Sequence, residues 1–300
     1  MSEEPALALR VDVCTYRGLR RGTPRLLDVL ARHGVRATFC VAAGPDRSGL
    51  AVVRVLRQRG FLRKMLRTRA LSMYGVSTAL RGTLLPARRI AHGGRASLRR
   101  LLEGGHEIAL HGWDHVRWQT ALDRLDGATI AEDYARASGA LEDILGSRPR
   151  ATAAPAWLTS ARSLEAVDEQ AFAWASDTRG TCPFLPRAGG RTHRVPQVPV
   201  TLPTLDESLG RDAQSAGEYF TSVLDVVSRP RGRNVLAIHA EAEGIAHSAA
   251  FERFLAEAIE RGARILTLGE FLAATPRPLP VASVERTTID GRAGEVSVQR

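Results

Sequence analysis

The sequence predicts an α/β protein built on a parallel sheet that closes toward a barrel. Short apolar runs alternate with segments of helical period along most of the 300 residues, and this alternation is typical of strand-helix-strand units with parallel strands. The number of such units favours a barrel over an open sheet. The hydrophobic content of 44% suits one large domain or two small ones, and we expect one large domain. Three widely spaced cysteines do not make a disulfide framework.

The expected elements follow one another in order. The first strand is the apolar run 7–13, followed by a helix over 24–33 that Thr23 caps and Gly34 ends, and by a second strand over 36–41. Later strands are expected at 107–110, 173–176, 198–200, 234–238 and 264–267. Helical periodicity lies between many of them, at 97–102, 129–145, 163–169, 216–228 and 249–261.

Two regions break this pattern. Residues 61–90 combine large apolar side chains with arginines, and we expect a basic amphipathic insert within the barrel domain of residues 1–273. The tail 274–300 is rich in proline and polar residues, with a turn signal at Asp290, and we expect it to be loosely ordered.

The net charge of +10 comes from one segment. Residues 47–102 contain 14 of the 42 lysines and arginines and no acidic residue, so the rest of the chain is mildly acidic. Such a local field attracts polyanions, namely nucleic acid, anionic lipid head groups or phosphorylated substrates. Aromatic residues for base stacking are few there, which argues against nucleic acid.

Chemistry-bearing side chains stand at the expected strand ends. Asp12 and Cys14 point to the same face of the first strand, because side chains two residues apart in a strand do so. His111 and His115 are spaced to bind one metal ion if the chain turns helically, or they are a pair of surface histidines. His239 ends a late strand, where it could act as a general acid or be structural.

The motifs LRVDVCTYRG, GHEIALHGWDH, SDTRG, PQVPVTLPTLDE and AIHAEAEG resemble the NodB-type polysaccharide deacetylase superfamily. Within it, the last two motifs and the insert resemble the branch that removes a formyl group from undecaprenyl-linked formamido-arabinose in lipid A modification. The resemblance covers about residues 7–273 and implies a distorted (β/α) barrel.

The resemblance also implies residue roles and a divalent metal ion. Asp12 matches the family's general base, His111 and His115 match two metal ligands, and His239 matches the general acid. Asp177 matches the carboxylate that tunes this acid. Arg179, Trp157 and Glu241 are expected to support the site or the substrate. Glu241 and Glu243 would contact sugar hydroxyls or solvate a loop.

The chain departs from the family pattern at two positions. Cys14 stands where the family has a metal-ligand aspartate; a thiolate ligand would favour zinc over Mg²⁺ or Mn²⁺, whereas a neutral thiol would leave a weak two-histidine site. Leu158 stands where the family commonly has an arginine after the tryptophan, and Arg162 or Arg179 is a candidate to orient the base instead.

The insert is expected to contact a membrane. Its apolar and basic residues recur at helical spacing, as expected for an interfacial helix or, alternatively, for ordinary core packing. The patch consists of Phe61, Arg63, Lys64, Met65, Leu66 and Arg67. The chain has no recognisable signal segment and no run of about 18 apolar residues. We therefore expect peripheral attachment at the cytoplasmic face of the inner membrane, with no obligate protein partner.

Three functions remain open from the sequence. The first is a metal-dependent deformylase acting on the undecaprenyl-linked sugar. The second keeps the fold and removes an acetyl group from another sugar. The third is a non-catalytic lipid-binding relative that lost its metal when the ligand aspartate became Cys14.

Overall fold

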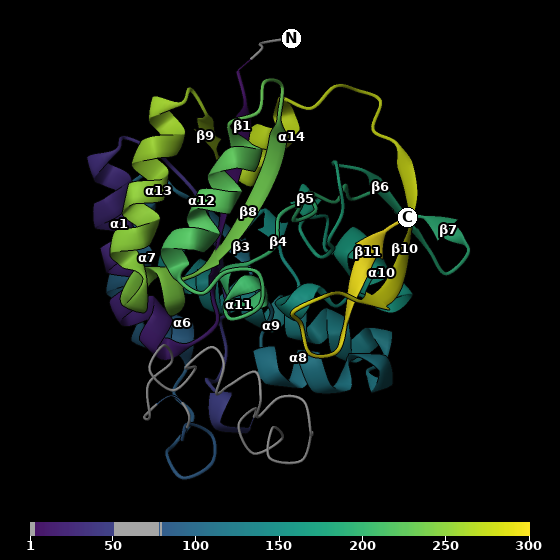
Figure 1. The fold of residues 1–300 in the computed structure, drawn as a ribbon. Helices are drawn as coiled ribbons and strands as arrows, with labels where there is room; N and C mark the ends of the chain where they lie inside the picture. Colours follow the sequence, from purple (N-terminus) through teal and green to yellow (C-terminus); the bar gives the residue numbers. More distant parts are fainter. Residues whose placement is uncertain (1–3, 51–77, 79) are drawn as a thin grey trace.

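A seven-stranded parallel sheet forms the centre of the computed structural model, which describes residues 4–50, 78 and 80–300 (Figure 1). The strand order is β5-β4-β3-β2-β1-β8, with β9 also paired to β1. The strands are β1 (Ala6–Val13), β2 (Thr38–Val41), β3 (Glu107–Leu110), β4 (Ala151–Thr152), β5 (Trp174–Ala175), β8 (Arg233–His239) and β9 (Arg264–Leu266). All pairs are parallel, so the carboxyl ends of the strands share one edge.

Strand β1 is the axis of this sheet. All eight of its residues are buried, and it pairs along nearly its whole length with β8. Its other side pairs with β9 over the first half and with β2 over the second half. The register puts Asp12 beside both Cys40 and His239, which brings two of the predicted site residues to neighbouring strand ends.

The sheet curls into a half barrel, and an irregular segment spans the gap between its two end strands. Pro196 and Val198 hydrogen-bond to Ala175 of β5, and Thr201 bonds to Val235 of β8. This segment was expected to contain a strand at 198–200; it makes isolated bridges instead of a regular ladder. The predicted α/β fold with a distorted barrel is confirmed.

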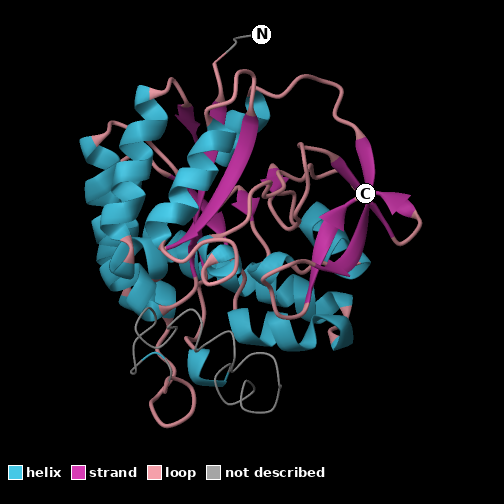
Figure 2. Cartoon of the chain, viewed as in Figure 1, coloured by secondary structure: helices cyan, strands magenta, loops and turns pink. Residues whose placement is uncertain are grey.

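Helices cover the outside of the curled sheet (Figure 2). Helices α1, α7, α12 and α13 lie together on one side, and α8, α9 and α10 on the other (Figure 1). The helices are α1 (Thr23–Arg32), α6 (Ile90–Gly93), α7 (Arg95–Glu103), α8 (His115–Ala121), α9 (Gly127–Leu145), α10 (Ala161–Glu169), α11 (Leu205–Ser208), α12 (Ala216–Val227), α13 (Ser248–Glu260) and α14 (Leu268–Ala273). Among the described helices, none has the length and apolar character needed to cross a bilayer.

Two short π-helical segments flank the strand ends, η1 (Gly18–Gly22) and η4 (Ala242–Ala246), and two short 3₁₀ turns are η2 (Leu122–Arg124) and η3 (Pro155–Trp157). Thr23 was expected to cap α1, and this is wrong. The helical turn of η1 runs directly into α1, so Thr23 is itself helical and the backbone of Gly18 accepts its N–H.

The C-terminal tail is ordered, which corrects the expectation of a loose one. Strands β10 (Val281–Thr288) and β11 (Glu295–Gln299) join β6 (Leu185–Ala188) and β7 (Arg191–Thr192) in a second sheet of order β11-β10-β6-β7. Val296 and Val298 are buried there, and β11 also bonds through its backbone to Arg179. Burial of alternate apolar residues stabilises these strands although their sequence is mostly polar.

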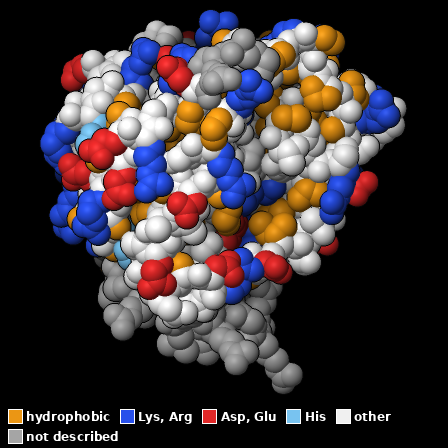
Figure 3. All heavy atoms as spheres, turned by 45° about the horizontal axis from the view of Figure 1, so that its top comes forward, with side chains coloured by type: hydrophobic (Ala, Val, Ile, Leu, Met, Phe, Trp, Pro, Cys, Tyr) orange, Lys and Arg blue, Asp and Glu red, His pale blue; other side chains and the backbone are white. Residues whose placement is uncertain are grey.

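Most of the predicted membrane insert, including the patch at 61–67, lies outside the described residues. On the face seen in Figure 3, acidic and basic side chains are intermixed on the left, while hydrophobic side chains gather on the right. Val281 of β10 is one exposed large hydrophobic residue of the second sheet.

Candidate active site

Cys14, His111 and His115 form a three-donor cluster at the carboxyl edge of the sheet. One ligand atom of each lies within 4.8 Å of the others, and Cys14 Sγ is 3.7 Å from His111 Nε2. Asp114 caps α8 by accepting the Arg117 N–H at 2.9 Å. Residues 111–114 form an irregular turn after β3, and α8 begins at His115. This turn brings the His115 ring to 5.2 Å from that of His111.

The cluster is preorganised for a cation. His111 Nδ1 lies 2.7 Å from the carbonyl oxygen of Ala153, so this nitrogen donates and Nε2 is left with a lone pair facing Cys14. Burial lowers the pKa of His111 to about 4 and, with the charge of His111, lowers the pKa of His115 well below its ordinary value. Both imidazoles are therefore neutral near pH 7, as ligation requires.

Cys14 needs a cation to ionise. Burial raises the pKa of its thiol well above the ordinary value, and the charges of Glu241 and Asp12 raise it further. A divalent ion at the cluster would supply the opposing positive charge. The donor set of one sulfur and two nitrogens fits a zinc-type site with an open coordination position.

Asp12 is a buried carboxylate held by Arg10. The Arg10 guanidinium donates to both of its oxygens, at 2.6 and 2.9 Å. Burial by itself would raise the pKa of Asp12, but the charges of Arg10, His111 and His239 together hold that pKa below its ordinary value. Asp12 is thus ionised and fixed in orientation beside the three-donor cluster.

The sequence reasoning missed Arg10. Arg162 and Arg179 were the candidates for orienting the base, but Arg162 bonds to backbone carbonyls of residues 123 and 125. Arg179 bonds to Glu207 and to the carbonyl of Leu202. A signal was available, since Arg10 lies two residues before Asp12 in one strand and so shares its face.

His239 has a different carboxylate neighbour from the one expected. Burial alone would lower its pKa, yet the negative charges of Asp206 first, and then of Asp12 and Glu243, raise it above the ordinary value. Asp177, expected to tune His239, instead accepts from the Ala154 backbone at 2.7 Å and from Gln197 at 3.1 Å. Burial raises the pKa of Asp177 to about 6.

Asp177 acts on the three-donor cluster indirectly, through the backbone of residues 153 and 154. It holds the N–H of Ala154, whose neighbour Ala153 supplies the carbonyl that orients His111. Asp206 lies in the first turn of α11, and the N-cap residue Thr204 donates to it at 2.6 Å. Which carboxylate faces His239 depends on the path of residues 196–206, and the sequence alone does not indicate that path.

Glu241 and Glu243 do not solvate a loop, because both are fully buried. Glu241 Oε1 accepts from the backbone of Cys14 at 3.1 Å and from both donors of Thr15 at 2.8 and 2.7 Å. It therefore fixes the loop that carries Cys14. Gly18 permits this contact, since a Cβ there would lie 2.1 Å from the Glu241 oxygen.

Trp157, a predicted support residue, is buried beneath three guanidinium groups. Arg10, Arg179 and Arg292 lie 5.3, 5.1 and 4.5 Å from its ring centroid. Glu207 neutralises two of them, at 3.0 Å from Arg179 and 3.3 Å from Arg292. Arg292 comes from the turn between β10 and β11, so the C-terminal sheet packs directly against the site's support.

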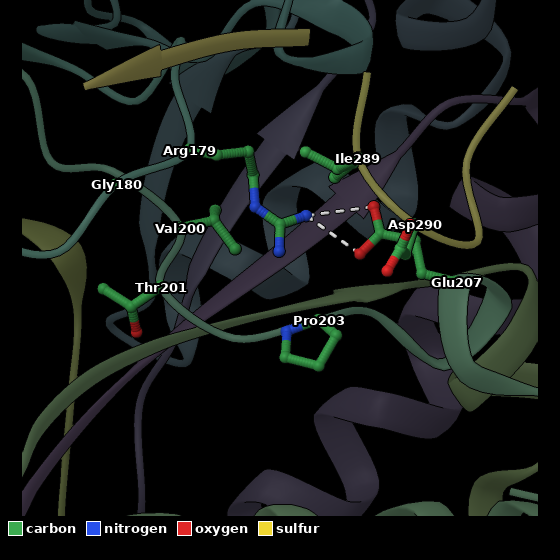
Figure 4. A pocket seen from close by; sticks show the side chains of 8 residues that line it. All are labelled: Arg179, Gly180, Val200, Thr201, Pro203, Glu207, Ile289 and Asp290. Atoms are coloured by element: carbon green, nitrogen blue, oxygen red, sulfur yellow. Dashed lines mark hydrogen bonds and ion pairs between the residues drawn. The ribbon is translucent and has the colours of Figure 1, made fainter. Parts of the chain in front are cut away.

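A pocket opens beside this network (Figure 4). Arg179 extends across it toward Glu207, and Ile289 and Asp290 of the C-terminal turn face it. The remaining lining residues are Gly180, Val200, Thr201 and Pro203. The residues of the three-donor cluster, Asp12 and His239 do not line it. The pocket therefore lies outside the predicted catalytic residues.

Comparison with known proteins identifies relatives. The sequence profile described as "Polysaccharide deacetylase" matches residues 2–173. A protein of Shewanella sediminis, described as a probable 4-deoxy-4-formamido-L-arabinose-phosphoundecaprenol deformylase, is 36% identical over 297 residues, covering 98% of this chain and 94% of that one.

Solved structures share the fold. A protein of Mycobacterium smegmatis assigned to the polysaccharide deacetylases superposes with a TM-score of 0.61 at 20% identity, covering 93% of this chain and 94% of that one. A family 4 acetyl xylan esterase of Clostridium thermocellum, solved in complex with a cobalt ion, superposes with a TM-score of 0.52 at 19% identity over 89% and 90% of the two chains.

Proposed function

This chain belongs to the polysaccharide deacetylase family of hydrolases, and we propose that it cleaves the formamide of 4-deoxy-4-formamido-L-arabinose carried on undecaprenyl phosphate. The products are formate and the lipid-linked 4-amino sugar. The similarity to the Shewanella sediminis protein over 98% of the chain supports this substrate. The expected setting is a step of lipid A modification.

The observation that carries the proposal is the three-donor cluster beside an ionised, buried carboxylate. Cys14, His111 and His115 would hold a divalent ion, with zinc favoured by the sulfur ligand. When bound, such an ion polarises an amide oxygen and acidifies a water molecule. Asp12 lies two residues before Cys14 near the carboxyl end of β1, which keeps this carboxylate close to the three-donor cluster.

Asp12 acts as the general base in this proposal. Its carboxylate takes a proton from the attacking water, whose oxygen bonds to the formyl carbon. Arg10 keeps Asp12 in one orientation through two hydrogen bonds. Both oxygens retain further lone pairs, so the guanidinium does not prevent proton transfer.

His239 acts as the general acid. The carboxylates around it, Asp206 foremost, favour its protonated form, so it can donate a proton to the sugar nitrogen as the carbon–nitrogen bond breaks. The β1–β8 register places it directly beside Asp12. In this proposal the base and the acid therefore come from the adjacent ends of β1 and β8.

The substrate's lipid carrier implies work at a membrane surface. We propose peripheral contact with the cytoplasmic face of the inner membrane, by the basic and apolar side chains at 61–67. Those residues lie outside the described part of the chain, and the support for this step is their sequence and the substrate named for the relative.

Formate release from the purified lipid-linked sugar tests the function. We expect turnover with a stoichiometric divalent ion, and loss of both metal and turnover in Cys14→Ala. Cys14→Asp should keep a metal site while shifting its preference toward harder ions. Acetate release from an N-acetyl sugar exceeding formate release would contradict the deformylase, and a metal-free, inactive protein would indicate a lipid-binding relative.

A further inference from the structure

A cluster of arginines surrounds Tyr16, just beyond the metal cluster. The guanidinium groups of Arg20, Arg81 and Arg88 lie 5.7, 5.0 and 5.2 Å from the Tyr16 ring centroid. Arg20 and Arg88 also donate to the Tyr16 hydroxyl, at 3.0 and 3.2 Å. Three positive charges thus converge on one phenol.

These charges are only partly neutralised. Asp46 is the nearest carboxylate, 3.8 Å from Arg81. Its oxygens already accept the Tyr16 backbone N–H at 3.0 Å and the Ser48 hydroxyl at 2.6 Å. Within the described parts of the chain, Arg20 and Arg88 pair with no carboxylate, so the cluster carries an excess of positive charge at its exposed side.

The cluster is held in place by tight packing. A Cβ at Gly93 would lie 2.2 Å from the Tyr16 ring, so α6 contacts the ring with no side chain between them. The backbone of Asp46 donates to the Arg88 carbonyl at 2.8 Å, which ties the residue 45–48 loop to the segment that carries Arg88. The phenol accepts hydrogen bonds from two arginines, and its own hydrogen is free to donate.

We propose that Arg20, Arg81, Arg88 and the Tyr16 hydroxyl form a binding site for a phosphate ester, the phosphodiester that joins sugar to polyprenol. This assignment rests on the proposed function, because it places the reacting formamide at the metal cluster. Guanidinium groups match phosphate oxygens in shape and charge. The site gives the enzyme selectivity for lipid-linked over free sugars.

The spacing suits one substrate molecule. Tyr16 follows Cys14 by two residues, so their Cα atoms are at most about 7 Å apart. The three-donor cluster and the arginine cluster therefore branch from one short stretch of chain. The proposal places the reacting formamide at the first and the anomeric phosphate, one sugar ring away, at the second.

Calorimetry with geranyl phosphate and with geraniol tests the site directly. The double variant Arg20→Gln/Arg88→Gln should weaken geranyl phosphate binding by about tenfold or more, as expected for lost hydrogen bonds to a charged group, and leave geraniol unchanged. The matched control Arg95→Gln/Arg99→Gln removes two exposed arginines from α7 and should bind as the parent does. Equal binding of geranyl phosphate by parent and double variant would overturn the proposal.

Kinetics and vesicle binding distinguish a site for the substrate's phosphodiester from a site for a lipid head group or a free anion. The double variant should lose kcat/KM on the prenyl phosphate-linked formamido sugar and keep it on the neutral methyl glycoside. If only binding to phosphatidylglycerol vesicles falls, or if inorganic phosphate binds as tightly as geranyl phosphate, the cluster serves a head group or a free ion and the proposal is wrong. If no sugar releases formate, the proposed function is wrong. The calorimetry tests the phosphate site independently of that result.

Discussion

A carboxylate is buried at each of the neighbouring ends of β1 and β8, and the two carboxylates have different hydrogen-bond partners. Asp12 ends β1 beside a guanidinium that contacts both of its oxygens. Glu243 follows β8 and accepts one backbone N–H, that of His239, at 2.8 Å, while its other oxygen has no hydrogen-bond partner among the described residues. Burial is complete for both groups, so the difference lies in the partner.

The partner decides the charge state. Arg10 holds the pKa of Asp12 below its ordinary range against the effect of burial. Burial raises the pKa of Glu243 to about 7, because the charge of His239 and the hydrogen bond from its backbone offset only part of the desolvation. The same sheet edge thus carries one carboxylate that stays ionised over the whole working pH range and another that holds its proton up to neutral pH.

Replacing Arg10 should have the largest effect. In Arg10→Met, Asp12 is left buried without its cation, and the hydrogen bonds from Arg10 to Ser176 are lost. Removing one partner of a buried ion pair costs about 3–5 kcal/mol. We expect that loss in urea unfolding, together with loss of formate release.

The double variant Arg10→Met/Asp12→Leu is the matched control. It replaces both partners by apolar groups, which is often nearly neutral for a buried pair. Most of the stability should therefore return while activity stays absent. A loss below about 1 kcal/mol in the single variant would show that Asp12 is not dependent on Arg10.

The fold was largely predictable from the sequence because its parallel strands are short apolar runs. Strand β3 was predicted at its observed bounds, and β1 within one residue. Strand β10 was missed because its sequence is polar and its partner β6 lies far upstream, with Val281 beside Leu185. Pairing at that separation leaves no local pattern to detect.

The site was predictable only where a residue stands at a strand end. That rule placed Asp12, His111 and His239 correctly at one edge of the sheet. It failed for Arg10, because this residue lies inside an apolar strand and not at its end. Only the structure shows that the whole strand is buried, so that the guanidinium needs a buried partner. It also failed for Asp206, which lies in a short helix after the irregular segment.

Glu243→Gln should change the pH dependence of stability. The pKa of Glu243 in the fold, about 7, exceeds the ordinary 4.5. Between these two pH values the Glu243 carboxyl loses its proton in the unfolded chain but keeps it in the folded chain. The free energy of unfolding of the parent protein therefore falls as pH rises through this window. Gln cannot ionise, so the free energy of unfolding of the Glu243→Gln variant, relative to that of the parent, should rise by about 3 kcal/mol from pH 4.5 to 7.

Urea unfolding at pH 5 and pH 7.5 measures this difference. Glu260→Gln, an exposed glutamate at the end of α13, controls for the loss of a negative charge at the surface. A constant gap between Glu243→Gln and the parent at both pH values would mean that Glu243 is ionised throughout, as Asp12 is.

Asp206→Asn should give the smallest effect, seen in the pH profile of kcat/KM. Asp206 is the foremost of the carboxylates that raise the pKa of His239. Without it that pKa falls, so His239, the proposed general acid, loses its proton at a lower pH. The alkaline limb of the profile then shifts down, by up to about one pH unit for a single nearby charge. Asp177→Asn is the matched test, because Asp177 faces Gln197 and Ala154 instead. The alkaline limb should stay in place there, and a shift in Asp177→Asn without one in Asp206→Asn would return the tuning role to Asp177.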